Sequence, residues 1–176
     1  FGKGAMGSDG IPVYAMPRMH EYLSTCGPWS QLVDLNNIEL QTLFADQTIT
    51  LNERITITPF LVPHRDEYTE TVGYKIEGPN QSVLFIPDIN KWEKWDRDIT
   101  EEVSKVDLAF LDATFYANGE IPGRDMSEIP HPFISESMQV LSESAAKIRF
   151  IHFNHTNPVM RSGTDERKEV LDAGFG

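Results

Sequence analysis

The sequence contains a single cysteine, Cys26, so no disulfide can form within the chain, and we expect a reducing, cytoplasmic location. No apolar run approaches the length of a membrane span, so we expect no membrane partner. Lys and Arg number 15 against 27 Asp and Glu, which gives a net charge of −12 without any basic cluster. Nucleic acids require a basic footprint, so a small-molecule or peptide substrate is favoured over a nucleic acid.

The 176 residues suffice for one core of ordinary size, and we predict a single domain over residues 1–176. The first half predicts strand hairpins, and the second half alternates strands with helices, which favours half of an α/β (α+β) sandwich over a doubly wound sheet. The predicted hairpins pair 48–51 with 55–57 and 71–76 with 82–86. Later elements are strands 106–111 and 148–153, a helix capped by Asp98, a striped helix from Pro132 and a helix over 165–173.

Polar side chains that can bind metal follow several apolar runs of the sequence. Loops at the ends of buried strands are where rigid scaffolds hold their chemistry, and imidazole with carboxylate is a ligand set of zinc and iron. The pattern therefore predicts a metal site built from several strand ends. The candidate residues are His64, Asp88, Asp112, His131, His152 and His155.

Each candidate also has a simpler interpretation. His64 could be a loop histidine bonded to a neighbouring acid, and Asp88 could cap the turn that follows it. Asp112 could orient a ligating imidazole or accept a bond from a nearby loop amide. His152 and His155 lie three residues apart, so both can ligate only if the chain turns between them.

His131 precedes Pro132, which places it near the start of the predicted helix. The helix dipole there would lower the pKa of the imidazole, and a neutral histidine suits general acid–base work. The alternative is a poor N-cap residue that faces solvent. The weakly periodic stretch 113–130 lies between Asp112 and His131 and is a candidate lid or substrate loop.

The order of these motifs resembles the metallo-β-lactamase fold, in the branch of tRNA 3′-processing endonucleases and cyclic phosphodiesterases. The resemblance runs through His64, Gly73-Tyr74, Val83–Asp88, Leu111–Phe115, His131 and His152. Segments Val13–Met19, Gly27–Val33 and His64–Glu67 resemble the coenzyme PQQ synthesis protein B family in particular. The resemblance implies that His64, Asp88 and His152 bind metal, while Asp112 and His131 assist catalysis. His155 departs from that family and is a further candidate ligand.

The His-x-His-x-(Asp/Gly)-His loop that marks the superfamily does not occur in this sequence. The resemblance therefore implies the C-terminal portion of an αββα sandwich, an incomplete domain cut from a longer protein. We expect exposed apolar patches where the other sheet would pack, with poor stability or self-association as a homo-oligomer.

The leading hypothesis is a hydrolase that uses a divalent metal, zinc first, with iron or manganese as alternatives. Metal-activated water would attack an ester, phosphoester or amide. Two alternatives stay open: an iron-dependent hydroxylase related to the PQQ synthesis protein, and a fold remnant without activity in this truncated form.

Overall fold

A computed structural model describes residues 1–176, which form two compact units. The first unit comprises residues 1–47 and 65–70, and the second comprises residues 48–64 and 71–176. The single domain predicted over residues 1–176 stays a prediction, because a division into compact units does not decide how many domains the chain contains. No helix of the chain is long and apolar enough to cross a bilayer.

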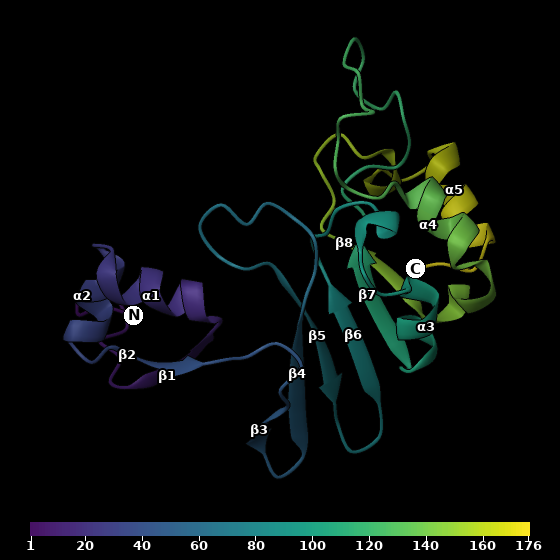
Figure 1. Ribbon diagram of the computed structural model, residues 1–176. Helices are drawn as coiled ribbons and strands as arrows, with labels where there is room; N and C mark the ends of the chain where they lie inside the picture. The colour runs from purple at the N-terminus through teal and green to yellow at the C-terminus, as the bar shows by residue number, and fades with distance from the viewer. The chain divides into compact units, whose positions relative to one another are not determined.

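The first unit is a small αβ layer (Figure 1). Two parallel strands pair in register from Ile11 with Ile38 to Ala15 with Thr42. The elements are β1 (Ile11–Ala15), α1 (Pro17–Thr25), α2 (Trp29–Asp34) and β2 (Ile38–Thr42).

The second unit is built on a six-stranded sheet in the order β3-β4-β5-β6-β7-β8. The strands from β3 to β6 are antiparallel neighbours, whereas β6, β7 and β8 are parallel. Both predicted hairpins are confirmed. The strands are β3 (Ile49–Asn52), β4 (Ile55–Leu61), β5 (Val72–Glu77), β6 (Ser82–Ile86), β7 (Leu108–Asp112) and β8 (Ile148–Ile151).

Helices cover one face of this sheet (Figure 1). Val103, Ile134 and Val170, one from each α-helix of the second unit, belong to the same buried core as Leu111 and Phe150 of the strands. The helical elements are η1 (Trp92–Lys94), α3 (Ile99–Ser104), α4 (Ile134–Val140), η2 (Ser142–Lys147), η3 (Pro158–Met160) and α5 (Asp165–Asp172).

The other face of the sheet carries apolar side chains that remain partly exposed. The strand register places Tyr74 beside Phe85, and Phe85 beside Phe110, on this face, and all three have intermediate exposure. Alternation explains the pattern, because successive residues of a strand point to opposite faces. An apolar face without full cover agrees with the expectation of exposed apolar surface.

Two sequence predictions need correction here. The striped helix from Pro132 is shorter than predicted, since α4 begins at Ile134 and gives way to the 3₁₀ helix η2 after Val140. The last strand ends at Ile151 rather than at residue 153, because His152 adopts a left-handed backbone with φ of 62°. The predicted cap at Asp98 is confirmed, since its carboxylate accepts bonds from Thr100 N and Glu101 N.

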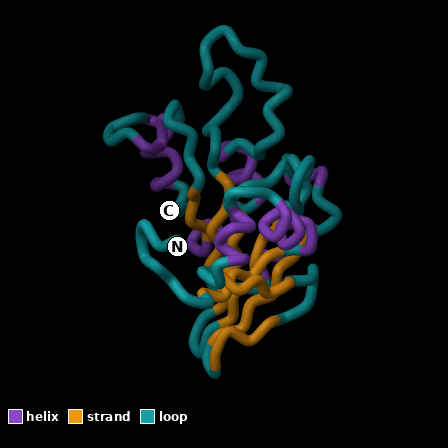
Figure 2. The backbone as a smooth tube through the Cα atoms, turned by 90° about the vertical axis from the view of Figure 1, so that its left-hand side faces the viewer, coloured by secondary structure: helices purple, strands orange, loops and turns teal.

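The stretch 113–130 is a long loop that reaches beyond the sheet and helices (Figure 2). It has a small core of its own, in which Phe115, Met126 and Ile129 pack with Phe133. A bridge between Phe115 and Phe133 ties the two ends of the loop together. The loop is thus an ordered segment that brings its two ends, Asp112 and His131, to the same place.

Candidate metal centre

Four strands deliver the candidate residues to one edge of the sheet. Strand β4 runs parallel to β6 because each is antiparallel to β5, and β7 and β8 continue in the same direction. The carboxyl ends of these strands therefore meet at one edge. His64 follows β4, Asp88 follows β6, Asp112 is the last residue of β7 and His152 comes directly after β8.

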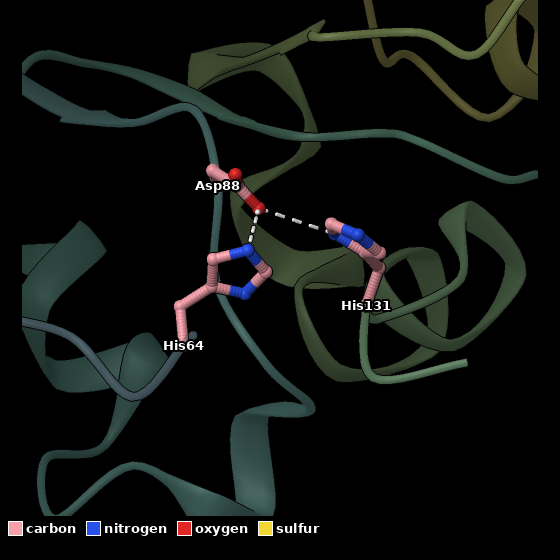
Figure 3. Close-up of side chains that lie close together, drawn as sticks. All are labelled: His64, Asp88 and His131. Carbon is pink, nitrogen blue, oxygen red and sulfur yellow. Dashed lines mark ion pairs between the residues drawn. The ribbon is translucent and has the colours of Figure 1, made fainter. Parts of the chain in front are cut away.

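His64, Asp88 and His131 form the first group of side chains that could hold a metal ion. Figure 3 shows the Asp88 carboxylate between the two imidazoles, with Oδ1 3.2 Å from His64 Nε2 and 3.4 Å from His131 Nδ1. Despite these distances, Asp88 Oδ1 is buried and has no hydrogen-bond partner. A buried carboxylate oxygen in this state requires a cation.

The orientation of His64 strengthens this interpretation. Its Nδ1 lies 3.2 Å from the side-chain oxygen of Asn90, an acceptor that favours the tautomer with a proton on Nδ1. The backbone N–H of Asn90 donates to Pro63 O at 2.7 Å and holds the two loops together. In that tautomer the lone pair of His64 Nε2 faces a carboxylate oxygen at 3.2 Å, and either a metal ion or a proton on Nε2 satisfies the pair. The residues present therefore fit a divalent metal.

Asp112 is fully buried and contacts this group through a hydrogen bond to His131. Its Oδ2 accepts bonds from Ile89 N at 3.1 Å and His131 Nδ1 at 2.8 Å. Its Oδ1 accepts bonds from the backbone N–H of Thr114 at 2.8 Å and from the Thr114 hydroxyl at 2.7 Å. Four donors are the full complement of an ionised carboxylate, so no lone pair of Asp112 remains for a metal.

The second group of close side chains contains Asp88, Asp112 and His152. His152 Nδ1 lies 3.8 Å from Asp112 Oδ1 and 3.1 Å from the Thr114 hydroxyl. Because Asp112 has no free lone pair, Asp88 and His152 are the members of this group whose ligand atoms stay available to a metal. The rings of His131 and His152 lie 6.2 Å apart, and those of His64 and His131 lie 5.3 Å apart, so the three imidazoles converge on Asp88.

The carboxylates around His131 also decide its charge. Burial lowers the pKa of this imidazole, but the hydrogen bond to Asp112 and the negative charges of Asp112 and Asp88 outweigh burial and raise the pKa above its usual value. The expected lowering by the helix dipole is therefore wrong. Its premise fails because the N-cap of α4 is Phe133, so His131 lies outside the first turn of the helix.

A separate contact fixes the segment that carries His131. Lys91 Nζ lies 2.6 Å from Glu136 Oε2 and 3.6 Å from the centre of the Phe133 ring. Glu136 Oε2 also accepts a bond from the backbone N–H of Phe133 at 2.9 Å. These contacts join the turn after Asp88 to the start of α4, so the backbone next to His131 is held in place.

Comparisons with known proteins agree with this architecture. A family model described as "Beta-lactamase superfamily domain" matches residues 4–153. The chain belongs to the metallo-β-lactamase superfamily. Coenzyme PQQ synthesis protein B of Pseudomonas fluorescens is 25% identical over 193 residues, which cover 93% of this chain and 62% of that protein. The protein of the same name from Ruegeria pomeroyi is 28% identical over 114 residues, or 60% of this chain and 38% of its own length.

Solved structures support the fold of this superfamily member. The zinc-bound PqqB from Methylobacterium extorquens matches with a TM-score of 0.75 at 21% identity, over 94% of this chain and 62% of that one. The metallo-β-lactamase-fold protein YhfI from Bacillus subtilis matches with a TM-score of 0.62 at 18% identity, over 93% and 59%. The chain thus spans about three fifths of the length of these relatives, and the predicted partial metallo-β-lactamase fold is confirmed.

Most of the predicted site residues of this metallo-β-lactamase relative lie together. His64, Asp88, Asp112, His131 and His152 surround one edge of the sheet, whereas His155 is exposed and joins neither group of close side chains. Metal binding by His155 stays a prediction that this geometry does not favour. The alternative bonding of Asp112 to a loop amide also occurs, because the carboxylate accepts from two backbone N–H groups as well as from His131.

Sequence reasoning missed two residues of the site, Asn90 and Thr114. Each stands two positions after a strand-end carboxylate, Asp88 or Asp112, and contacts an imidazole nitrogen of His64 or His152. The spacing Asp-x-Asn and Asp-x-Thr is the signal that could have identified them.

Proposed function

We propose that this chain forms part of a metal-dependent hydrolase. The observation that carries the proposal is Asp88, whose buried Oδ1 has no hydrogen-bond partner and faces the lone pair of His64 Nε2 at 3.2 Å. His64, Asp88 and His152 would hold a divalent metal, with zinc favoured because the PqqB structure from Methylobacterium extorquens is zinc-bound. When bound, such a metal lowers the pKa of water and polarises an ester, phosphoester or amide.

His131 supplies the acid–base chemistry of the proposed site. Its Nδ1 is engaged by Asp112, so Nε2 is the atom that can give up a proton. The raised pKa keeps the imidazole protonated over a wider pH range, which suits donation to a leaving oxygen or stabilisation of negative charge on it. Asp112 holds the His131 ring in one orientation and stabilises its protonated form, as the aspartate of a catalytic triad does for its histidine.

The substrate is expected to be a small molecule or a peptide. The net charge of −12 opposes binding of a long polyanion, and the loop 113–130 begins beside Asp112 and ends beside His131, where it can contact a bound substrate. A solved diphosphatase from the PhnP family shares the fold with a TM-score of 0.54, and this likeness supports testing phosphoesters first.

Hydrolysis of chromogenic phosphodiester, carboxylic ester and anilide substrates in the presence of zinc, manganese or iron tests the proposal. We expect turnover with at least one metal, and a loss of at least about 100-fold for His131→Gln, since general acid–base catalysis contributes this much. His155→Gln is the matched control and should retain activity. Turnover that is equal in His131→Gln and in the unchanged chain would rule out the assigned role of His131.

A second candidate function follows from the curated relatives, which are named for coenzyme PQQ synthesis. The same imidazole and carboxylate ligands suit iron, which would serve an oxidation rather than a hydrolysis. Oxygen uptake that depends on iron and not on zinc would favour this candidate. Turnover of a phosphodiester with zinc or manganese, without oxygen uptake, would favour the hydrolase.

A further inference from the structure

Thr114 occupies a central place in the site, although neither the sequence motifs nor the comparisons assign it a role. It is buried, and its hydroxyl Oγ1 lies 2.7 Å from Asp112 Oδ1, 3.1 Å from His152 Nδ1 and 3.3 Å from His131 Nδ1. One hydroxyl therefore contacts a buried carboxylate, two imidazoles and, at 3.3 Å, the backbone oxygen of His152. Its single proton can be given to only one of these partners.

The distances decide where that proton goes. Asp112 is an acceptor only, it is the nearest partner, and a bond to a carboxylate is stronger than a bond to a neutral acceptor. The Thr114 hydroxyl therefore donates to Asp112 Oδ1. Toward His152 the same oxygen can then act only as an acceptor, so His152 Nδ1 must carry a proton. His131 does not compete for this position, because its Nδ1 donates to Asp112 Oδ2 at the shorter distance of 2.8 Å.

We propose that Thr114 is a positioning residue that holds His152 as the Nδ1–H tautomer and leaves Nε2 as its metal-binding atom. The contact matters because the side chain of His152 is 45% exposed, so little packing restrains the ring. A free exposed imidazole rotates and exchanges between tautomers. The hydrogen bond between His152 Nδ1 and the Thr114 hydroxyl restrains the ring and determines which nitrogen is left to bind a metal.

The backbone of Thr114 holds the same loop. Its carbonyl accepts a bond from Asn154 N at 3.0 Å and from Asn157 Nδ2 at 3.3 Å, while Ala113 N donates to Ile151 O at 2.9 Å. These bonds hold the turn in which His152 has a positive φ of 62°. Thr114 thus fixes both the backbone and the ring of His152. A small apolar residue in its place could hold the backbone but not the ring.

Metal binding through His152 Nε2 rests on the proposed metal-dependent function, whereas the Nδ1–H tautomer of His152 is independent of that function. We would therefore measure the tautomer in the metal-free chain, by long-range ¹H–¹⁵N correlation of ¹⁵N-histidine-labelled protein at a pH where the ring is neutral. His152→Gln identifies the signal. We expect His152 to be protonated at Nδ1 in the unchanged chain and in Thr114→Ser, and to shift toward Nε2 protonation in Thr114→Val.

Zinc titration of the same three proteins provides the second measurement. Partners that orient a ligating histidine change metal affinity by about 10- to 100-fold, so Thr114→Val should weaken zinc binding by at least about tenfold while Thr114→Ser stays within about threefold. An Nε2–H tautomer of His152 in the unchanged chain overturns the proposal, even if Thr114→Val does not fold. An Nδ1–H tautomer with no zinc binding in any of the three proteins leaves Thr114 in its positioning role and refutes the metal function instead.

Discussion

Replacement of Asp112 by Asn should destabilise the fold by about 2–4 kcal/mol, and the hydrogen-bond geometry explains why. The buried carboxylate accepts four bonds, two at each oxygen, whereas Asn offers one oxygen and one N–H₂ donor. The hydroxyl of Thr114 can turn and the ring of His131 can change tautomer, but backbone N–H groups cannot adapt. Whichever way the amide faces, the N–H of either Ile89 or Thr114 therefore loses its acceptor.

An orphaned buried N–H costs about 1–3 kcal/mol, and the remaining bonds lose charge assistance worth about another 1 kcal/mol in total. Urea denaturation at pH 7, followed by fluorescence of the buried Trp92 and Trp95, measures the change. Asp107→Asn is a matched control, because Asp107 accepts analogous bonds from the N–H and hydroxyl of Ser82 but at the exposed surface. Water can replace the bonds that Asp107 accepts, so the urea midpoint of Asp107→Asn should hardly differ from that of the unchanged chain. Equal midpoints for the two variants would refute the reasoning.

Three further outcomes are expected. Gly73→Ala should destabilise the fold by about 1–3 kcal/mol in urea denaturation, because the added Cβ would overlap the Phe60 ring. An unchanged midpoint would contradict this close packing. Hydrogen bonds from Thr100 and Glu101 lower the pKa of Asp98 in the folded chain. The ionised Asp98 therefore stabilises the fold above the ordinary carboxyl pKa of about 4, and this contribution is lost as the pH falls through the lowered pKa of the folded state. Asp98→Asn keeps the cap, and its stability should fall less steeply in acid. The isolated chain should self-associate through the partly exposed sheet face, and Phe110→Lys should shift sedimentation toward monomer; a wild-type chain that is monomeric at every concentration would show that this face needs no cover.

The strand hairpins and the edge of the sheet that bears the site were predictable from the sequence. Alternating apolar residues fix which side of a strand is buried, and turn residues such as Gly78-Pro79 fix where it ends. Because polar residues such as Asp88 and Asp112 directly follow the apolar runs, their meeting at one edge follows from strand direction alone. This part of the site needed no knowledge of tertiary contacts.

The details that depend on tertiary contacts were not predictable. The start of α4 at Ile134 depends on Glu136, which accepts bonds from Phe133 N and Lys91, and Lys91 is distant in the sequence. The charge of His131 likewise depends on two carboxylates, Asp88 and Asp112, that come from other strands. Local patterns such as the helix dipole carry no information on these partners, so they gave the wrong direction for the pKa.

The metal content of purified variants tests the central claim most directly. The chain would be loaded with zinc, dialysed and analysed by plasma mass spectrometry, beside His152→Ala and the matched control His155→Ala. The account predicts near-stoichiometric zinc in the unchanged chain and in His155→Ala, with a large loss in His152→Ala, because only His152 lies with Asp88 and Asp112. Zinc retained in His152→Ala but lost in His155→Ala, or zinc bound by none of the three proteins, would contradict the proposed metal centre.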